Sequence, residues 1–158
     1  MKKIFFCAAL LLCCLSAKSH FVIDVLAKVQ SLEDLNKRMK LGDIAFGDSI
    51  TWHLFNASLK QNNGGGNMAC ELKDYERGFY RIGKFTPFMV MVDVKAYLIN
   101  GFVLSFLDYA EESVRENLIK TYGKPTEEKD GQLFWFATNV CIMAQRTEYA
   151  YMVIFKKM

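Results

Sequence analysis

Strand-like segments fill most of the chain after residue 67, and they constrain the fold more than any other feature. In one of them Val90, Val92 and Val94 alternate with Met89, Met91 and Asp93, which places the two sets on opposite faces of a strand. Four segments come before the clearest helix and three come after it. The expected strands are 68–72, 78–82, 88–95, 98–107, 132–137, 140–146 and 150–156.

The clearest helix is predicted over residues 108–123. Val114, Leu118 and Tyr122 recur every four residues, and Gly123 followed by Pro125 is a typical helix end. Within the strand expected over 98–107, Asn100-Gly101 has two interpretations: a hairpin turn, or a bulge in a continuous strand.

Two further helices are predicted in the first part of the chain. Residues 20–40 favour a helix, with a restart at Ser31, whose Ser-Leu-Glu-Asp run resembles a capping box. A short strand at 44–46 then leads through Gly47 into a helix expected to continue to about Gln61. The order predicts an α+β domain, an antiparallel sheet with two main helices packed on one face. The pattern is a tandem helix-plus-strands repeat preceded by an N-terminal helix.

The first nineteen residues have the pattern of a signal peptide, which leaves residues 20–158 as one domain. A basic start is followed by an apolar run from Ile4 to Leu15, and Ala17 and Ser19 are small residues suited to cleavage. This apolar run is shorter than the about twenty residues of a spanning helix. The expected location is the periplasm or the medium; the alternative is an outer-membrane lipoprotein lipidated at Cys14.

Removal of this leader makes the chain electrically neutral. Without Lys2, Lys3 and Lys18, 17 of the 20 basic residues remain, equal to the 17 acidic ones. No basic excess is left to attract nucleic acid.

Cys70 and Cys141 are the two cysteines of the mature chain. In an exported protein they are candidates for one disulfide; the alternative is two buried thiols. No His/Cys cluster has ligand spacing, so neither a metal nor a cofactor is expected.

The block Gly47-Asp48-Ser49-Ile50-Thr51 resembles the nucleophile block of Gly-Asp-Ser-Leu (SGNH) esterases. Such a serine needs a base to accept its proton. The family takes its histidine from an Asp-x-x-His pair near the C-terminus, but here no histidine follows His53. The sequence therefore favours a helix-capping turn, and keeps Ser49 with His53 as the enzymatic alternative.

A wider resemblance covers most of residues 41–158. The sequences Ile44-Ala45-Phe46-Gly47-Asp48-Ser49, Lys120-Thr121-Tyr122-Gly123-Lys124-Pro125, Phe134-Trp135-Phe136 and Cys141-Ile142-Met143 together resemble small exported proteins of Bacteroides-type bacteria. The repeat is also similar in architecture to β-lactamase inhibitor proteins and to SmpA/OmlA outer-membrane lipoproteins. These resemblances imply a fold, but they transfer no binding residue.

Aromatic residues around the middle strands are the candidates for a protein-binding surface. Tyr80, Phe85 and Phe88 are side chains of the kind found in binding hot spots, and the alternative is that they fill the core. Met68, Met89, Met91, Met143 and Met152 are interpreted as core residues. Asp93 is the polar residue of interest within an apolar strand, with a solvent-facing edge position as its simpler explanation.

Three functions follow from these patterns, in this order. The first is an exported, non-enzymatic module that binds an envelope or secreted protein, as an inhibitor or adaptor does. The second is a structural component of the envelope, and the third is a serine esterase that uses Ser49.

Overall fold

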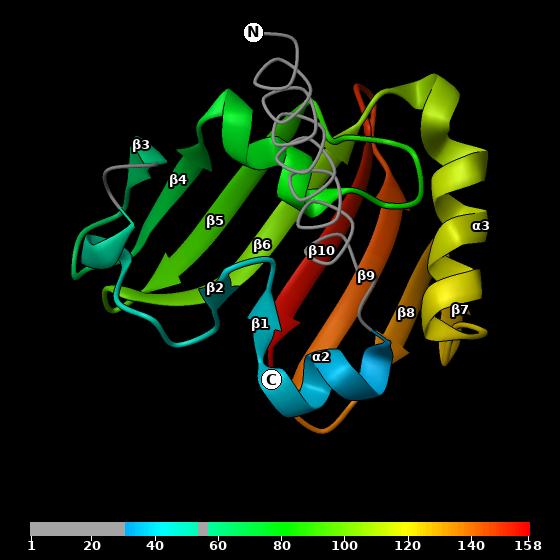
Figure 1. Ribbon diagram of the computed structural model, residues 1–158, viewed down its shortest axis with the longest axis horizontal. Helices are drawn as coiled ribbons and strands as arrows, with labels where there is room; N and C mark the ends of the chain where they lie inside the picture. Colours follow the sequence, from blue (N-terminus) through cyan, green and yellow to red (C-terminus); the bar gives the residue numbers. More distant parts are fainter. Residues whose placement is uncertain (1–30, 54–56) are drawn as a thin grey trace, which may run out of the picture.

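The computed structural model describes residues 31–53 and 57–158, which form an α+β domain around one large antiparallel sheet (Figure 1). The predicted leader, which includes Cys14, and residues 20–30 of the helix expected over 20–40 lie outside these residues. The strands of the large sheet are β3 (Ala57–Asn62), β4 (Met68–Leu72), β5 (Met89–Lys95), β6 (Leu98–Phe106), β7 (Glu127–Lys129), β8 (Gln132–Phe136), β9 (Val140–Arg146) and β10 (Tyr151–Lys157).

The sheet consists of two four-stranded meanders joined through their last strands. Its order is β3-β4-β5-β6-β10-β9-β8-β7, and all neighbours are antiparallel. The joint is the β6–β10 pair, whose register runs from Tyr151 opposite Phe106 to Lys156 opposite Gly101. The last strand of each meander therefore lies at the centre of the sheet, and the first strand of each, β3 or β7, lies at an edge.

One face of the sheet carries the hydrophobic core. Alternate residues of the central strands are buried there, including Val92, Phe102, Trp135 and Phe155. The ring of Phe102 lies 5.1 Å from that of Phe46 and 6.1 Å from that of Tyr80. The segment around β2 (Ile44–Ala45) and the 3₁₀ helix Asp74–Tyr80 thus cover the first meander.

Helix α3 (Glu111–Tyr122) covers the second meander on the same face (Figure 1). Its Tyr122 ring packs against Trp135 at 6.4 Å and Phe155 at 6.3 Å. A 3₁₀ turn over Asp108–Ala110 leads into the helix, and Gly123 ends it with φ 82°. The helix predicted over 108–123 is confirmed.

The short helix α2 (Leu32–Arg38) closes one end of the core. Ser31 is its N-cap and accepts a hydrogen bond from the Asp34 N–H, which confirms the predicted restart at Ser31. Leu35 is fully buried. Asn36 of this helix accepts a hydrogen bond from Asn139 N at 2.7 Å, which fixes α2 to the turn between β8 and β9.

The helix predicted to run to about Gln61 is wrong, and with it the predicted pair of main helices on one face and the tandem helix-plus-strands repeat. Residues Ile50–Trp52 form a single 3₁₀ turn, and β3 occupies Ala57–Asn62. Trp52 and Leu59, whose spacing of seven residues would place them on one apolar face of that helix, are 74% and 54% exposed. Residues 57–62 form a strand because β3 pairs with β4, and Lys60 on β3 makes a 2.7 Å ion pair with Glu71 on β4.

Two other expected features are corrected or decided by the sheet. Residues 78–82 are not a strand, because the 3₁₀ helix Asp74–Tyr80 occupies most of that segment. Asn100-Gly101 forms a bulge: Asp93 pairs with Gly101, and the register then shifts to Val94 opposite Ile99. A two-residue turn, Ala96-Tyr97, makes the β5–β6 hairpin, with φ 50° and 64°.

Two short strands, β1 (Lys40–Leu41) and β2 (Ile44–Ala45), form a separate hairpin beside the large sheet.

Among the residues that the structure describes, no helix is long and apolar enough to cross a membrane.

Gly101 lies on β6 where the backbone of β10 leaves no room for a side chain. A Cβ atom at this position would lie 2.8 Å from the carbonyl oxygen of Phe155. We expect Gly101→Ala to lower the free energy of unfolding by about 1–3 kcal/mol, because backbone atoms must move. Urea unfolding measures this change. Gly78→Ala is the matched control, since nothing lies within 4 Å of its added Cβ; equal losses in both variants would contradict the explanation.

Candidate functional site

The second face of the large sheet carries a continuous row of apolar side chains. Register places Met91 opposite Val103, Val103 opposite Ile154, Ile154 opposite Met143, and Met143 opposite Phe134. All five side chains are partly exposed. We call these five residues, on β5, β6, β10, β9 and β8, the apolar row. Four strand spacings of about 4.8 Å make it roughly 19 Å long.

Methionines extend this row toward a second line of residues. Met89 and Met152 both lie opposite Ser105 on the same face, and Gln145 follows Met152 on β9. The prediction that the methionines fill the core is therefore wrong for Met89, Met91, Met143 and Met152. It holds for Met68, which packs against the core cluster.

In the described part of the chain every covering element packs on the opposite face. Helices α2 and α3 contribute Leu35, Val114 and Leu118 to the core, and the β2 segment contributes Phe46. Figure 1 shows α2 and α3 on the same side of the sheet. Residues 31–53 and 57–158 thus leave the apolar row without a covering layer.

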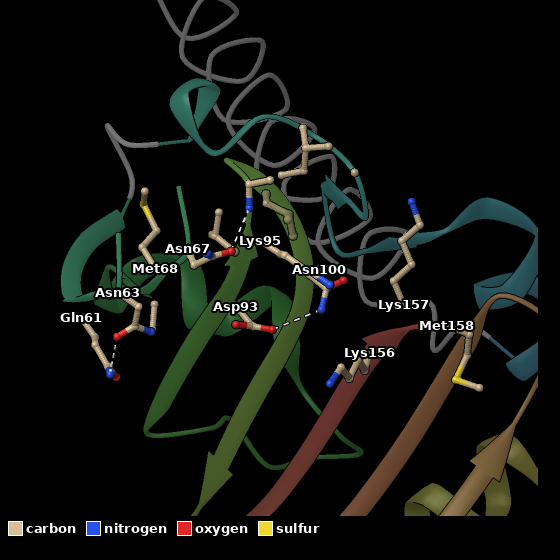
Figure 2. A pocket seen from close by; sticks show the side chains of 16 residues that line it. Gln61, Asn63, Asn67, Met68, Asp93, Lys95, Asn100, Lys156, Lys157 and Met158 are labelled. Carbon is tan, nitrogen blue, oxygen red and sulfur yellow. Dashed lines mark hydrogen bonds between the residues drawn. The ribbon is translucent and has the colours of Figure 1, made fainter. Parts of the chain in front are cut away.

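A polar groove of about 740 Å³ opens at the β5–β6 turn end of the sheet (Figure 2). Asp93 lies in it and accepts a hydrogen bond from Asn100 Nδ2 at 3.3 Å. Asp93 faces solvent, as its simpler explanation requires, but it sits on the third strand from the sheet edge and not at the edge itself. The other labelled side chains are Gln61, Asn63, Asn67, Met68, Lys95, Lys156, Lys157 and Met158.

The wall of the groove is held by contacts between distant loops. Asn67 accepts a hydrogen bond from Ala96 N at 3.2 Å and donates one to the Gly64 carbonyl at 3.1 Å. Tyr97 N donates to the Gly66 carbonyl at 2.8 Å. A Cβ atom on Gly66 would lie 2.5 Å from the Tyr97 ring, so glycine is needed at this point of the loop.

The Gly47-Asp48-Ser49 segment continues the sheet beside β6. Gly47 N donates to the Ile99 carbonyl at 2.7 Å, and Ile99 N donates to the Asp48 carbonyl at 2.9 Å. Ser49 pairs with Leu98 in an antiparallel bridge. These residues occupy the position beside β6 that β10 leaves free beyond Gly101.

The side chains of this segment form local contacts rather than a Ser/His pair. The Ser49 hydroxyl lies 2.7 Å from the Thr51 hydroxyl, and His53 Nε2 lies 3.4 Å from an Asp48 carboxylate oxygen. The second Asp48 contact is a hydrogen bond from Ala45 N at 3.1 Å. The segment therefore acts as a turn, although it does not cap a regular α-helix as predicted.

The three aromatic candidates for protein binding lie in different environments. Tyr80 is 3% exposed and packs in the core, so its ring is out of reach of a partner. Burial raises the pKa of its hydroxyl, and the Asp43 and Glu76 carboxylates raise it further. Phe85 is half-buried against the core with Lys84 over its ring, and Phe88 is exposed.

Cys70 and Cys141 are free thiols on opposite faces of the sheet. Cys70 is buried on the core side of β4, and Cys141 is half-buried on the face with the apolar row. Three strands separate β4 from β9, a distance of roughly 19 Å, whereas a disulfide needs Cα atoms within about 7 Å. The disulfide alternative does not fit this geometry.

The sequence pattern contained part of the signal for the apolar row. Alternation in 88–95 separated Met89 and Met91 from Val90 and Val92, but it did not tell which set is covered.

No family model, curated protein or solved structure matches the chain.

We expect both thiols to be free and unreactive in the folded protein. Burial raises the pKa of Cys70, and burial outweighs the nearby Lys156 in raising that of Cys141, so at neutral pH the reactive thiolate form is depleted in both. Mass spectrometry after iodoacetamide treatment should show little alkylation of the native protein produced without residues 1–19. The same treatment in denaturant without reductant should label both cysteines. A mass two hydrogens lower, with no labelling, would contradict this result.

Proposed function

We propose that the protein is an exported, non-enzymatic module that binds another protein of the bacterial cell envelope. Export rests on the signal-peptide pattern of residues 1–19. Binding rests on the uncovered apolar row. The inhibitor-like or adaptor-like architecture expected from the sequence remains part of this proposal.

The observation that carries the proposal is that the central strands are apolar on both faces. On β10, core residues Val153 and Phe155 alternate with Met152 and Ile154 of the second face; β9 shows the same pattern. An antiparallel sheet with one face in water normally alternates apolar with polar residues, and runs without alternation are typical of strands covered on both sides. A second layer is therefore expected over the apolar row.

The chemistry of this face suits a protein partner. Methionine side chains are flexible and polarisable, so they adapt to the shape of an apolar surface that contacts them. The row lies on an open sheet face, whereas small molecules bind in concave sites that enclose most of their surface. Contiguous exposed apolar patches are characteristic of interaction sites.

The row has defined ends. At one end, the residue opposite Met91 on the neighbouring strand β4 is Glu71, which makes ion pairs with Lys60 and Arg77. The position next to Phe134 is the exposed Glu127 on β7. Charged residues thus flank the apolar row at both of its ends, where the polar rim of a binding interface would lie.

The test replaces apolar contacts while preserving side-chain shape. We expect the triple variant Met91→Gln/Met143→Gln/Met152→Gln to lose most of its partner, because Gln is close to Met in length but prefers water. Tagged protein crosslinked in its native envelope should recover the partner at least about tenfold less well than the parent, since each 1.4 kcal/mol lost is a factor of about ten. Quantitative mass spectrometry measures recovery.

The matched control is Met91→Leu/Met143→Leu/Met152→Leu, which keeps the face apolar and should retain the partner. Urea unfolding checks that both variants are folded. Equal recovery by the Gln variant and the parent would rule out this face as the binding site. A parent that forms dimers broken only by the Gln variant would identify a second copy, rather than a different envelope protein, as the occupant.

A further inference from the structure

The polar groove continues directly from the apolar row. The row passes through Met91, Val103 and Ile154, and the next line of residues on the same face is Asp93, Gly101 and Lys156. Successive residues on one face of a strand lie about 6.8 Å apart. Whatever lies over Ile154 is therefore within reach of Lys156.

The groove has a local excess of positive charge. Lys95, Lys156 and Lys157 line it, and Asp93 is its one acidic side chain. None of these three lysines makes an ion pair with the described residues. The mature chain has equal numbers of acidic and basic residues, so this excess belongs to the groove and not to the protein as a whole.

The polar groups of the groove are held in place before any ligand binds. Both ends of the Asn67 amide are used to hold the β5–β6 turn and the glycine loop. Asn100 donates to one oxygen of Asp93, which reduces the competition of that carboxylate for the lysines. Lys157 lies across Gly47, with its Nζ 3.7 Å from where a Cβ would be. Ordered walls lower the entropy cost of binding.

We propose that this groove binds carboxylate groups of an acidic segment of the partner protein, next to the part that covers the apolar row. This inference rests on the proposed function and defines the chemistry of the partner. A second contact is needed because the apolar row alone is too small for a stable interface. The apolar row and the line of residues beside it, which includes Met89 and Met152, together cover about 19 Å by 13 Å, roughly 250 Å². A stable interface buries more, about 800 Å² on each partner.

Several separate carboxylates fit the groove better than one compact phosphate. The lysines come from the ends of two strands, β5 and β10, that are separated by β6. Arginine is absent from the lining residues of the groove, although its planar fork is the usual choice for bidentate phosphate binding. Lysines act as separate point charges, and a space of about 740 Å³ holds several residues of a peptide.

The test uses labelled hexaglutamate as the probe and the protein without its leader. We expect it to bind in the groove and to shift the backbone NMR signals of Lys95, Gly101 and Lys156. Affinity should fall as ionic strength rises, because the Debye length shortens from about 30 Å at 0.01 M salt to about 10 Å at 0.1 M. Hexalysine should not bind at this place.

The variant Lys95→Gln/Lys156→Gln/Lys157→Gln should bind hexaglutamate at least about fivefold more weakly, as expected for the loss of three solvent-exposed charge contacts. The control Lys120→Gln/Lys124→Gln/Lys129→Gln removes the same charge from α3, from the segment that follows α3, and from β7. It should bind like the parent. Equal weakening in both variants would show a response to net charge only and would overturn the proposal.

Other outcomes also overturn the proposal while leaving the methionine test untouched. Inorganic phosphate that binds in the groove as tightly as hexaglutamate would identify a small-anion site. Sedimentation with phosphatidylglycerol vesicles that depends on the same three lysines, without hexaglutamate binding, would identify a lipid surface. Retention of the crosslinked partner by the lysine variant, together with its loss from the methionine-to-glutamine variant, would support the proposed function and reject the acidic segment.

Discussion

The antiparallel pairing of β6 with β10 is the interaction on which the rest of the structure depends. It joins strands that lie about fifty residues apart in the chain and turns two four-stranded meanders into one eight-stranded sheet. The pair contributes Phe102, Val153 and Phe155 to the core. On the opposite face it places Val103 against Ile154, the centre of the apolar row. Loss of this pairing would divide the core and the candidate binding face at the same time.

The two faces of the sheet have different relations to the rest of the chain. Helix α3 and the segments before β3 and β5 supply the apolar side chains that cover one face. On the other face the central strands are apolar, while the edge strands β3 and β7 are polar and mostly exposed. Short or charged edge strands discourage edge-to-edge aggregation. The apolar surface is therefore limited to the centre of the sheet, where a defined partner can cover it without promoting aggregation.

Much of the fold could be predicted from local patterns, and the failures have physical causes. The segments 68–72 and 140–146 were predicted with the observed bounds because both are short, mostly apolar runs, which are typical of buried strands. β3 was missed because Trp52 and Leu59 mimic helical spacing, whereas pairing with β4 decides the structure of Ala57–Asn62. Such pairing is a long-range interaction that propensity does not contain.

The candidate site was harder to predict than the fold for a related reason. Alternation assigns Met91 and Val92 to opposite faces, but only the tertiary arrangement decides which face receives the helices. The aromatic residues were misleading for the same reason, since Tyr80 is large enough to fill the space beside Phe102. Asp93 was recognisable from sequence as a polar residue in an apolar strand, but its groove depends on three other segments of the chain.

The β5–β6 turn links the stability of the sheet to the geometry of the groove. Ala96 and Tyr97 both have positive φ, a conformation that costs residues other than glycine roughly 1–2 kcal/mol each. Hydrogen bonds from Ala96 N to Asn67 and from Tyr97 N to Gly66 compensate for part of this strain. The turn fixes where β5 ends, and so where Lys95 lies relative to Lys156. Because Lys156 and Ile154 are on one face of the same strand, a partner that contacts the apolar row must also lie beside these charges.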